Sequence, residues 1–346
     1  MLALGENARD TAERDTPARA ATSDAVIHCF FCLSAIDSMI HSHHDPRLPL
    51  ADWMSTLDDG RSLHTLTVPG SHDTCAYTVD DALVRTQCAP LDAQLMHGVR
   101  MLDIRCRHVR DEFEIHHGGI SLGMTFDDVL ATCADFLAAH PGECIVMSVK
   151  DEWPAHACRR GFDATFDAHR ARHPGLRWHA GGAIPALGDV RGAIVLLRRF
   201  RSSRPLGIDL SAWPDNMTFT IDHPDAAFVI QDEYRVPVAA SIEHKWQAVD
   251  ALLTHMPSAD SGRWAINFCS GTGMGANPSR VARGDGRMKG IHARLAQRLC
   301  THHGPCGIVL LDFCDDDDWA LVRELVARNH DAGVRMPARS CRLLVP

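Results

Sequence analysis

The chain lacks the features that define several large classes of protein. No stretch reaches the roughly 20 consecutive apolar residues that a membrane-spanning helix needs. Positive charge is not in excess, because 35 Lys and Arg stand against 44 Asp and Glu for a formal net charge of −9. A nucleic-acid-binding protein normally carries a basic face, so this balance argues against one. Neither an internal repeat nor a linker is evident after residue 50, which favours one domain there.

The chain also lacks an organised set of cysteines. Its 13 cysteines are odd in number and scattered, which favours buried small apolar residues over a disulfide framework. Cys29–Cys32 has the spacing of a redox or metal motif, but no second pair accompanies it. His41, His43 and His44 have no neighbouring ligand set and are interpreted as a solvated loop. The apolar run Ala25–Ile36 follows acidic residues instead of a clean basic start, so secretion stays open.

Length and composition are those of a folded globular protein. Of the 346 residues, 45% are hydrophobic and 23% are charged, unlike a disordered chain. An α/β barrel typically needs roughly 250 residues as one unit. Residues 1–24 are rich in Ala, Arg, Asp and Thr without any period. We therefore expect residues 1–50 to be a disordered or targeting leader, and residues 51–346 to form one closed domain.

From Leu63 onward, short aliphatic runs alternate with helical patterns, as a barrel or an open parallel sheet requires. The expected strands are Leu63–Val68, Met101–Ile104, Glu114–His116, Cys144–Val149, Ala193–Leu197, Phe228–Gln231, Trp264–Phe268 and Ile308–Asp312. The expected helices are Thr125–Ala139, Ala155–His173, Ile242–His255, Gly290–His302 and Trp319–Arg328. The acidic run Asp315–Asp318 is expected to form the first turn of that last helix, favoured by the helix dipole, instead of a calcium site.

Titratable and charged residues fall at one end of these predicted strands. In an α/β barrel, the carboxyl ends of the strands carry the active site. A role in stability alone would not need so many charged side chains at the same end of different segments. The residues concerned are His72, Asp103, Arg105, His117, Lys150, Arg199, Asp232 and Asp312.

The two histidines and the arginine in this set predict a particular chemistry. A histidine titrates near neutral pH, so two converging imidazoles can remove a proton from an attacking hydroxyl and supply one to a leaving oxygen. An arginine beside them can pair with two oxygens of one phosphate. His72, His117 and Arg105 would therefore serve the cleavage of a phosphodiester through an internal hydroxyl.

Several motifs in order give the chain a family resemblance over roughly residues 55–335. It resembles the bacterial-type phosphatidylinositol-specific phospholipases C (the X-domain family), which implies a distorted (β/α)8 TIM-type barrel as the catalytic domain at residues 51–346. The motifs are Pro69–Asp73, His97–Arg100, Leu102–Arg105, His116–Gly118, Met147–Glu152, Trp213–Asn216, Gln231–Tyr234 and Leu310–Phe313.

The resemblance implies a general base and a general acid. His72 would deprotonate the inositol 2-hydroxyl, with Asp312 holding its imidazole in the required tautomer. His117 would protonate the departing diacylglycerol oxygen with help from Asp73. The products would be diacylglycerol and inositol 1,2-cyclic phosphate. Strand alternation lets only one of two adjacent histidines face the site, and the family motif, in which the acid directly precedes the glycine, selects His117 over His116.

The resemblance also assigns the charged residue beside the phosphate. Arg105, braced by Asp103, would neutralise charge on the phosphoryl oxygens. Eukaryotic relatives have an acidic residue at this position that helps to bind calcium. Because the cation is built into this chain, we expect metal-independent activity without a cofactor.

The remaining family positions concern the inositol ring. Lys150, Arg199 and Asp232 match residues that hydrogen-bond the ring hydroxyls, and Tyr234 matches the aromatic face on which inositol stacks. Donors and acceptors at fixed directions reject the wrong headgroup as well as hold the right one. The natural substrate, free phosphatidylinositol or a glycosylated lipid anchor, stays open, and so does the compartment, although the family favours secretion.

The chain departs from the family in its membrane contact. Where relatives carry tryptophan and tyrosines, this chain reads Gly271–Ala276 without an aromatic residue, followed by Arg280, Arg283, Arg287 and Lys289. Basic residues near an anionic leaflet contribute about 1 kcal/mol each, so transient electrostatic docking and a merely solvated loop are both open. We expect a monomer that contacts a membrane surface peripherally.

Two other functions compete with a phosphatidylinositol diacylglycerol-lyase. A metal-dependent glycerophosphodiester phosphodiesterase would need paired acidic metal ligands where the chain has Asp103 and Arg105. An inactive inositol-lipid binding module would not need a base, an acid and the carboxylate that orients the base.

Overall fold

The computed structural model describes residues 49–330. The leader and the features at Ala25–Ile36, Cys29–Cys32, His41, His43 and His44 lie outside this range, except for the last two residues of the predicted leader. Among residues 49–330, none of the helices has both the length and the apolar character needed to cross a bilayer.

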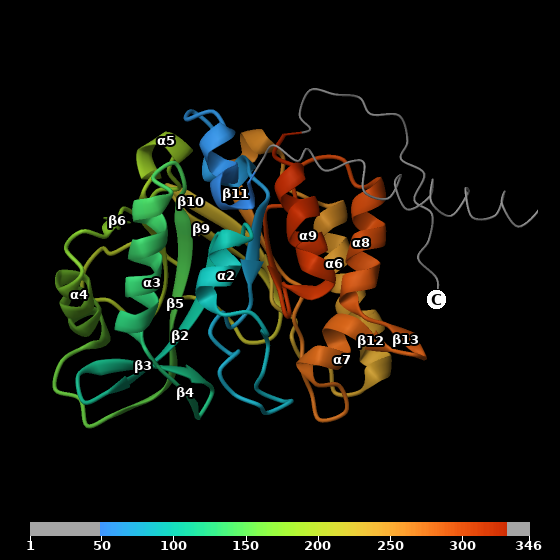
Figure 1. Cartoon of the computed structure of the whole chain (residues 1–346), viewed down its shortest axis with the longest axis horizontal. Helices are drawn as coiled ribbons and strands as arrows, with labels where there is room; N and C mark the ends of the chain where they lie inside the picture. Colours follow the sequence, from blue (N-terminus) through green and yellow to red (C-terminus); the bar gives the residue numbers. More distant parts are fainter. Residues whose placement is uncertain (1–48, 331–346) are drawn as a thin grey trace, which may run out of the picture. The chain divides into compact units, whose positions relative to one another are not determined.

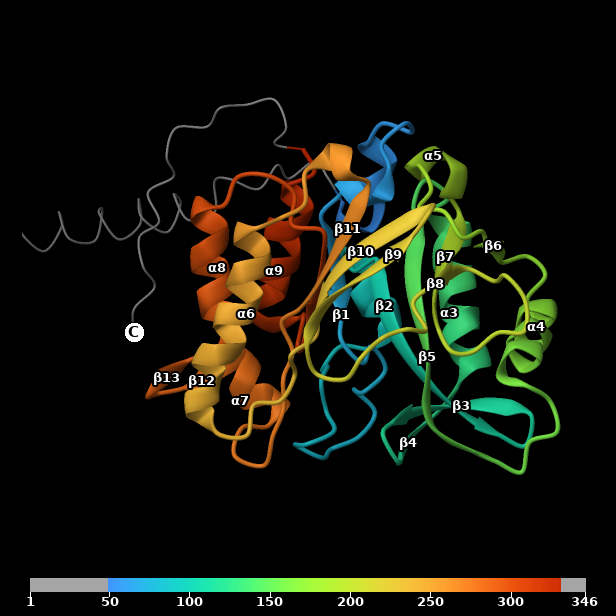
Figure 2. The ribbon, with the colours of Figure 1, turned by 180° about the vertical axis from the view of Figure 1, so that it is seen from behind.

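A largely parallel sheet forms the centre of the domain within residues 49–330 (Figures 1 and 2). The strands that follow one another across it are, in spatial order, β6 (Arg177–His179), β7 (Ala193–Arg199), β5 (Ile145–His156), β2 (Met101–Val109), β1 (Val68–Ser71), β14 (Ile308–Leu311), β11 (Arg263–Phe268), β10 (Ala226–Gln231) and β9 (Thr218–His223). These neighbours pair in parallel, except that β9 runs antiparallel to β10 at one edge. A hairpin attached to β2 adds two further antiparallel strands.

The two edges of this sheet approach each other without a strand ladder between them. A short strand, β8 (Ile208–Asp209), pairs with β7 on the same side as β6. The side chain of His223, the last residue of β9, bonds the backbone carbonyl of Asp209 at 2.9 Å. The sheet therefore curves into a barrel whose remaining gap is bridged by a side chain.

Helices cover the outside of the sheet, with α6, α8 and α9 over one part and α3 and α4 over another (Figure 1). Their apolar faces pack on strands that are buried on both sides, as in other parallel α/β folds. The α-helices are α2 (Leu91–Met96), α3 (Phe126–Ala139), α4 (Phe162–Arg172), α5 (Leu187–Val190), α6 (Ile242–Thr254), α7 (Pro278–Arg283), α8 (Ile291–Thr301) and α9 (Asp316–Ala327). Short 3₁₀ helices form at η1 (Leu50–Thr56), η2 (Leu63–Thr65), η3 (Ala239–Ser241) and η4 (Ala259–Ser261).

Four of the five predicted helices are confirmed to within three residues at each end. Helix α3 begins where expected because Thr125 caps it: the Asp128 amide donates to Thr125 Oγ1 at 3.2 Å, and Asp128 Oδ2 accepts from the Thr125 amide at 2.8 Å. This reciprocal pair is a capping box. The helix predicted at Ala155–His173 is too long, because β5 continues to His156 beside β2 and α4 begins only at Phe162.

Two predicted strands were wrong in extent or role. Leu63–Thr65 is a 3₁₀ turn, closed by a Thr65 amide that donates to the Ser62 carbonyl at 3.0 Å, so strand β1 begins at Val68. The segment predicted at Glu114–His116 is part of β3 (Glu112–His117), which folds back antiparallel on β2 and is followed by β4 (Ile120–Thr125). The chain reverses there because Arg110 and Asp111 both have positive φ, as a tight hairpin turn requires.

The acidic run before Trp319 does not form a regular first helical turn. Asp317, Asp318 and Trp319 have φ values of 50°, 54° and 63°, in the left-handed region. Their carboxylates therefore do not line the amino end of a right-handed helix. Asp316 pairs with Arg283 at 2.7 Å, and Asp318 pairs with Arg323 at 2.7 Å.

Candidate active site

The candidate site begins where β1 and β14 end side by side. Their register pairs Ser71 with Leu311, so the next residues, His72 and Asp312, meet. His72 Nδ1 lies 2.7 Å from Asp312 Oδ1, and Asp312 is buried. Gly70 allows this close passage of strands, because a Cβ there would stand 2.8 Å from Met101 Cβ.

The chain turns sharply after His72. Asp73 has a φ of 43°, a conformation that is strained for a residue with a side chain and that often occurs at functional sites. The Asp73 amide donates to Asp103 Oδ2 at 3.1 Å and so holds the turn in place. The turn directs the buried Asp73 carboxylate toward His117, whose Nδ1 contacts Asp73 Oδ2.

A β-hairpin carries His117 into the site. His117 is the last residue of β3, and the adjacent His116 is buried on the other side of the strand, 3.4 Å from Glu114 Oε2. Gly118 follows with a φ of 55°, and its amide donates to Glu152 Oε1 at 3.0 Å. The hairpin therefore brings a residue into the site from outside the parallel strands.

Arg105 lies between these two histidine–carboxylate pairs. Its Nε and Nη2 donate to Asp103 Oδ2 at 3.1 and 3.0 Å, and its Nη2 lies 2.8 Å from His72 Nε2. Its Nη1 lies 3.8 Å from Asp73 Oδ2. Asp103 and Arg105 are two residues apart on β2 and so share the inner face of the sheet.

The electrostatics of Asp103 follow from this arrangement. Burial favours the neutral acid, but the charges of Arg105 and Arg199 outweigh it and hold the pKa of Asp103 well below its usual range. Asp103 is therefore a carboxylate at neutral pH, and it keeps two guanidinium groups in place.

Strand β5 adds an ion pair that the sequence interpretation did not include in the site. Lys150 Nζ lies 2.5 Å from Glu152 Oε2, and Glu152 Oε1 lies 3.4 Å from Arg105 Nη1. Burial opposes ionisation of Glu152, but the charges of Arg105 and Lys150 lower its pKa to about 2. The sequence alone could have indicated Glu152, because residues 150 and 152 lie on the same face of an alternating strand and Lys150 was already a predicted site residue.

Arg199 and Asp232 are joined through Trp213. The Arg199 guanidinium carbon lies 3.7 Å from the centre of the Trp213 ring, close enough for a cation–π contact. Trp213 Nε1 donates to Asp232 Oδ2 at 2.9 Å, and Arg199 Nη1 lies 3.5 Å from Asp103 Oδ1. Trp213 therefore belongs to the wall of the site.

Tyr234 lies apart from this network. Its hydroxyl donates to Asp215 Oδ1 at 2.9 Å, and within residues 49–330 no hydrogen bond joins its side chain to the other predicted site residues. Its ring is half-buried, two residues beyond Asp232.

Two buried residues, which the sequence analysis did not identify, bond the backbone at the ends of β1 and β14. Gln87 Nε2 donates to the carbonyls of His72 and Leu311, each at 2.9 Å. Thr86 Oγ1 donates to the His72 carbonyl at 3.1 Å. These residues lie in a loop without hydrophobic periodicity, so no pattern marked them.

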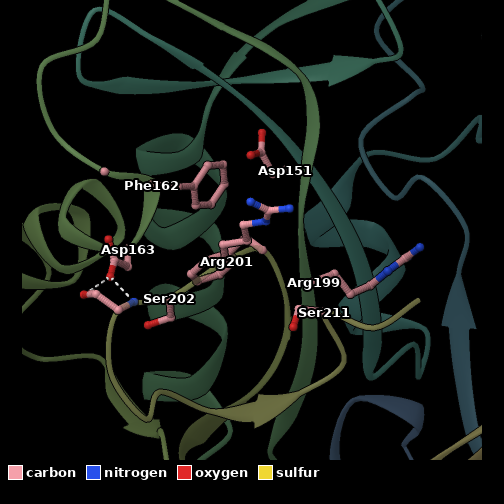
Figure 3. Close-up of a pocket in the computed structure, with 10 residues that line it drawn as sticks. Asp151, Phe162, Asp163, Arg199, Arg201, Ser202 and Ser211 are labelled. Carbon is pink, nitrogen blue, oxygen red and sulfur yellow. Dashed lines mark hydrogen bonds between the residues drawn. The ribbon is translucent and has the colours of Figure 1, made fainter. Parts of the chain in front are cut away.

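A pocket of about 500 Å³ adjoins the site on the outer face of β5 and β7 (Figure 3). It is lined by Asp151, Ser202 and Ser211 among others, and Asp151 alternates with the inward-facing Lys150 and Glu152. Figure 3 shows the guanidinium of Arg199 directed away from Asp163 and Ser202. Arg199 is thus the predicted site residue that the pocket shares.

Comparison with known proteins relates this geometry to a family. The family described as phosphatidylinositol-specific phospholipase C, X domain, matches residues 66–199. The 1-phosphatidylinositol phosphodiesterase of Listeria monocytogenes is 31% identical over 246 residues, which cover 66% of this chain and 71% of that protein. The chain belongs to the phosphatidylinositol-specific phospholipase C family. The enzyme of the same name from Staphylococcus aureus strain Newman is 32% identical over 53% of this chain and 64% of its own.

Solved structures of the family extend the likeness beyond the X domain. A variant of the phosphatidylinositol-specific phospholipase C from Staphylococcus aureus superposes with a TM-score of 0.72 at 26% identity, over 81% of this chain and 97% of that one. The Listeria monocytogenes enzyme gives a TM-score of 0.64 at 26% identity, over 81% and 99%. The predicted α/β barrel is thereby confirmed.

Proposed function

We propose that this protein cleaves phosphatidylinositol into diacylglycerol and inositol 1,2-cyclic phosphate. The observation that carries the proposal is the position of Arg105 between the two histidines. Its guanidinium lies 2.8 Å from His72 Nε2 and 3.8 Å from Asp73 Oδ2, the atom that contacts His117 Nδ1. A base, an acid and an anion clamp thus meet at one end of the barrel. We take the catalytic domain to be residues 51–346, with the inositol lipid as substrate.

In the first step, His72 removes the proton of the inositol 2-hydroxyl. Asp312 accepts from Nδ1 at 2.7 Å, which leaves the Nε2 lone pair as the proton acceptor and stabilises the imidazolium that forms. The freed oxygen attacks the phosphorus and closes the cyclic phosphodiester.

His117 supplies the proton for the leaving diacylglycerol oxygen. Asp73 holds the Nδ1 side of its ring, so Nε2 is free to face the leaving group. A protonated imidazole is a good donor near neutral pH, and general acid catalysis of this kind contributes typically 10²–10⁴-fold. Slow hydrolysis of the cyclic ester would use the same two rings in reversed roles.

Arg105 stabilises the negative charge that develops on the phosphoryl oxygens. Its side chain is 14% exposed, so its field acts in a largely water-excluded place, where preorganised charge is most effective. Asp103 and Glu152 fix its orientation. The carboxylates nearest to Arg105 are therefore already paired with guanidinium or ammonium groups. To bind a metal ion, they would first have to break these ion pairs.

The ring of the substrate would lie between Lys150, Arg199 and Asp232. Lys150 is 31% exposed at its side chain and can donate to a hydroxyl, while Asp232 can accept from one. Tyr234 would cover an apolar face of inositol from the rim.

Contact with a lipid surface would rely on apolar side chains more than on the basic segment. Arg280 pairs with Asp285 at 2.5 Å and Arg283 with Asp316 at 2.7 Å, so their charges are partly neutralised. Six of the large hydrophobic side chains that are exposed lie on loops and strand extensions at the site end of the barrel. They are Leu83, Ile120, Trp153, Met217, Val238 and Met274.

Phosphorus NMR of the purified protein with phosphatidylinositol micelles and excess chelator tests the proposal. We expect the signal of inositol 1,2-cyclic phosphate to appear. Activity that needs added calcium would overturn the role of Arg105 as the built-in cation. Lipid binding without turnover under both conditions would overturn the proposed activity.

Two variants test the acid and the base. We expect His72→Ala and His117→Ala each to lower cleavage by at least about 10²–10⁴-fold with an intact circular dichroism spectrum. His64→Ala, at a half-buried histidine of η2, is a control that should retain activity. Near-normal turnover in either site variant would refute the two-histidine mechanism.

A further inference from the structure

A lysine is buried beneath the substrate side of the barrel. Lys245 lies on α6 and is 1% exposed, and it is one of only three lysines in the chain. Its Nζ donates to Gln231 Oε1 at 2.9 Å. An ammonium group has three donors, yet within residues 49–330 this is its one hydrogen-bond acceptor. Burial of a charge so sparsely paired is costly.

Lys245 is one member of a buried network that fixes the Gln231 side chain. Gln231 Oε1 also accepts from the Glu233 amide at 2.8 Å. Gln231 Nε2 donates to Asn267 Oδ1 and to the Phe268 carbonyl, each at 2.8 Å. Because Lys245 can only donate, it requires the oxygen of the Gln231 amide to face α6. The amide can then hold both Glu233 and Phe268.

The bonds of Gln231 to the Glu233 amide and to the Phe268 carbonyl both hold backbone that carries residues of the site. The Glu233 amide lies between Asp232 and Tyr234, so its bond fixes the segment that carries both residues. The ring of Phe268 makes edge contacts with His72 and Trp213, with centroids 5.9 Å apart in each case. A single amide, oriented by Lys245, thus supports the predicted inositol-binding residues and the ring beside the base.

Lys245 can lose its proton, and so its charge, only slightly above neutral pH. Burial lowers its pKa to about 8, against the opposing charges of nearby acids. The groups that favour its protonated form are, in order, Asp232, Cys269, Glu233 and Asp312. On α6 itself, the neighbouring His244 is exposed and lies 3.3 Å from Glu233. On the packed helix α8, Arg294 and Arg298 pair with Glu243 and Asp250.

We propose that Lys245 is a positioning residue for substrate binding: its ammonium orients the Gln231 amide, and through it Asp232, Tyr234 and Phe268. The inference rests on the proposed function, since it concerns how the inositol ring is held. Lys245 touches none of the reacting atoms, so its loss weakens substrate binding and leaves the chemical step largely intact.

A purely structural role of Lys245 predicts the opposite pH dependence. Between pH 8 and the ordinary lysine pKa of 10.5, the unfolded chain binds the Lys245 proton more tightly than the folded chain does. The contribution of Lys245 to the free energy of unfolding therefore rises with pH in this range, whereas its support for substrate binding falls. Replacing the buried charge with an apolar side chain of similar volume is expected to be neutral or stabilising for the fold.

Steady-state kinetics of three variants test the proposal. We expect Lys245→Met to raise KM for phosphatidylinositol about tenfold with kcat changed less than threefold. In the wild type, KM should rise above about pH 8. Lys245→Arg should restore KM and remove that rise, because a guanidinium stays charged. Leu253→Ala, which removes a buried side chain further along α6, is the control for loosening this helix and should leave KM and its pH profile unchanged.

A second measurement needs neither a variant nor turnover. In protein labelled with ¹⁵N only at lysine, three side-chain signals can be titrated with and without myo-inositol. We expect the Lys245 pKa to rise when myo-inositol binds, because protonation and binding must assist each other equally. A wild type that cleaves the lipid but shows unchanged KM in Lys245→Met and an unshifted Lys245 titration would overturn the inference alone. A wild type without cleavage would overturn the proposed function instead.

Discussion

Arg105 Nη2 lies 2.8 Å from His72 Nε2, the ring nitrogen opposite the one that bonds Asp312. A guanidinium group has donors only, so Nε2 accepts and the imidazole proton is on Nδ1, facing Asp312. The two neighbours together select the neutral tautomer that a general base needs. We expect a substrate phosphate to draw the guanidinium away, so that Nε2 can accept the proton of the inositol hydroxyl.

Asp312→Asn should therefore impair catalysis more than it impairs folding. The amide keeps the size of the carboxylate but removes the charge, and its NH₂ group can turn toward Nδ1 and reverse the tautomer. We expect kcat to fall about 10²–10⁴-fold, measured by initial rates on phosphatidylinositol micelles. Asp285→Asn, at a carboxylate outside the site, serves as the control. A loss below about tenfold would show that His72 does not depend on Asp312.

Gln87→Leu should lower activity because Gln87 holds the loops after β1 and β14 together. The change removes three side-chain hydrogen bonds, because Gln87 Oε1 also accepts from the Cys314 amide at 3.2 Å, at a cost of roughly 1–3 kcal/mol each in unfolding free energy. Gln94→Leu is the control, since the buried Gln94 donates two side-chain hydrogen bonds, to the carbonyls of Thr74 and Ala89. We expect a somewhat larger stability loss in urea for Gln87→Leu than for Gln94→Leu, and a much larger loss of activity. Equal losses of activity in Gln87→Leu and Gln94→Leu would show that Gln87 stabilises the fold without a particular role in positioning the site.

Glu152 should contribute stability that is lost in acid. Its pKa is about 2 in the folded protein, against an ordinary value of 4.5, so the stabilisation is complete above pH 4.5. As the pH falls from 4.5 to 2, it disappears, because the unfolded chain binds a proton at this carboxylate in that range while the folded state still excludes it. A shift of this size corresponds to on the order of 3 kcal/mol. Urea unfolding of the wild type and of Glu152→Gln across this range should show a shallower pH dependence in the variant, and parallel curves would contradict it.

The exposed apolar side chains at the site end of the barrel, here called the apolar rim, should affect binding to lipid surfaces and not the chemical step. They are Leu83, Ile120, Trp153, Met217, Val238 and Met274. We expect Trp153→Ser combined with Met274→Ser to weaken binding to phosphatidylinositol vesicles, since burying such side chains contributes about 1.5–3 kcal/mol each. Cleavage of a short-chain substrate below its micellar concentration should be unchanged. Met96→Ser is the control, because Met96 is similarly exposed at the end of α2, before β2 begins. An equal loss of vesicle binding in Met96→Ser would show that the apolar rim has no particular role in binding the lipid surface.

The fold could be predicted well where a single segment specifies its own structure. Thr125 and Asp128 mark the start of α3 because a capping box is local. The segment Glu114–His116 was predicted as a barrel strand but belongs to β3, which pairs antiparallel with β2 and β4. An isolated short strand pattern does not reveal whether its neighbour runs parallel or antiparallel. Glu152 could have been found from alternation with Lys150, whereas no local pattern distinguishes Gln87 from other loop residues.

The sequence by itself determined which chemical groups the protein has and near which strand ends they lie, because strand patterns and short motifs are properties of neighbouring residues. Only the tertiary structure decided which groups touch. His72 and Asp312 are 240 positions apart, and their contact depends on the register of β1 against β14. The same holds for Arg105 beside His72 and for Lys245 under Gln231. Such pairings arise from the packing of whole strands and helices, which no single segment specifies.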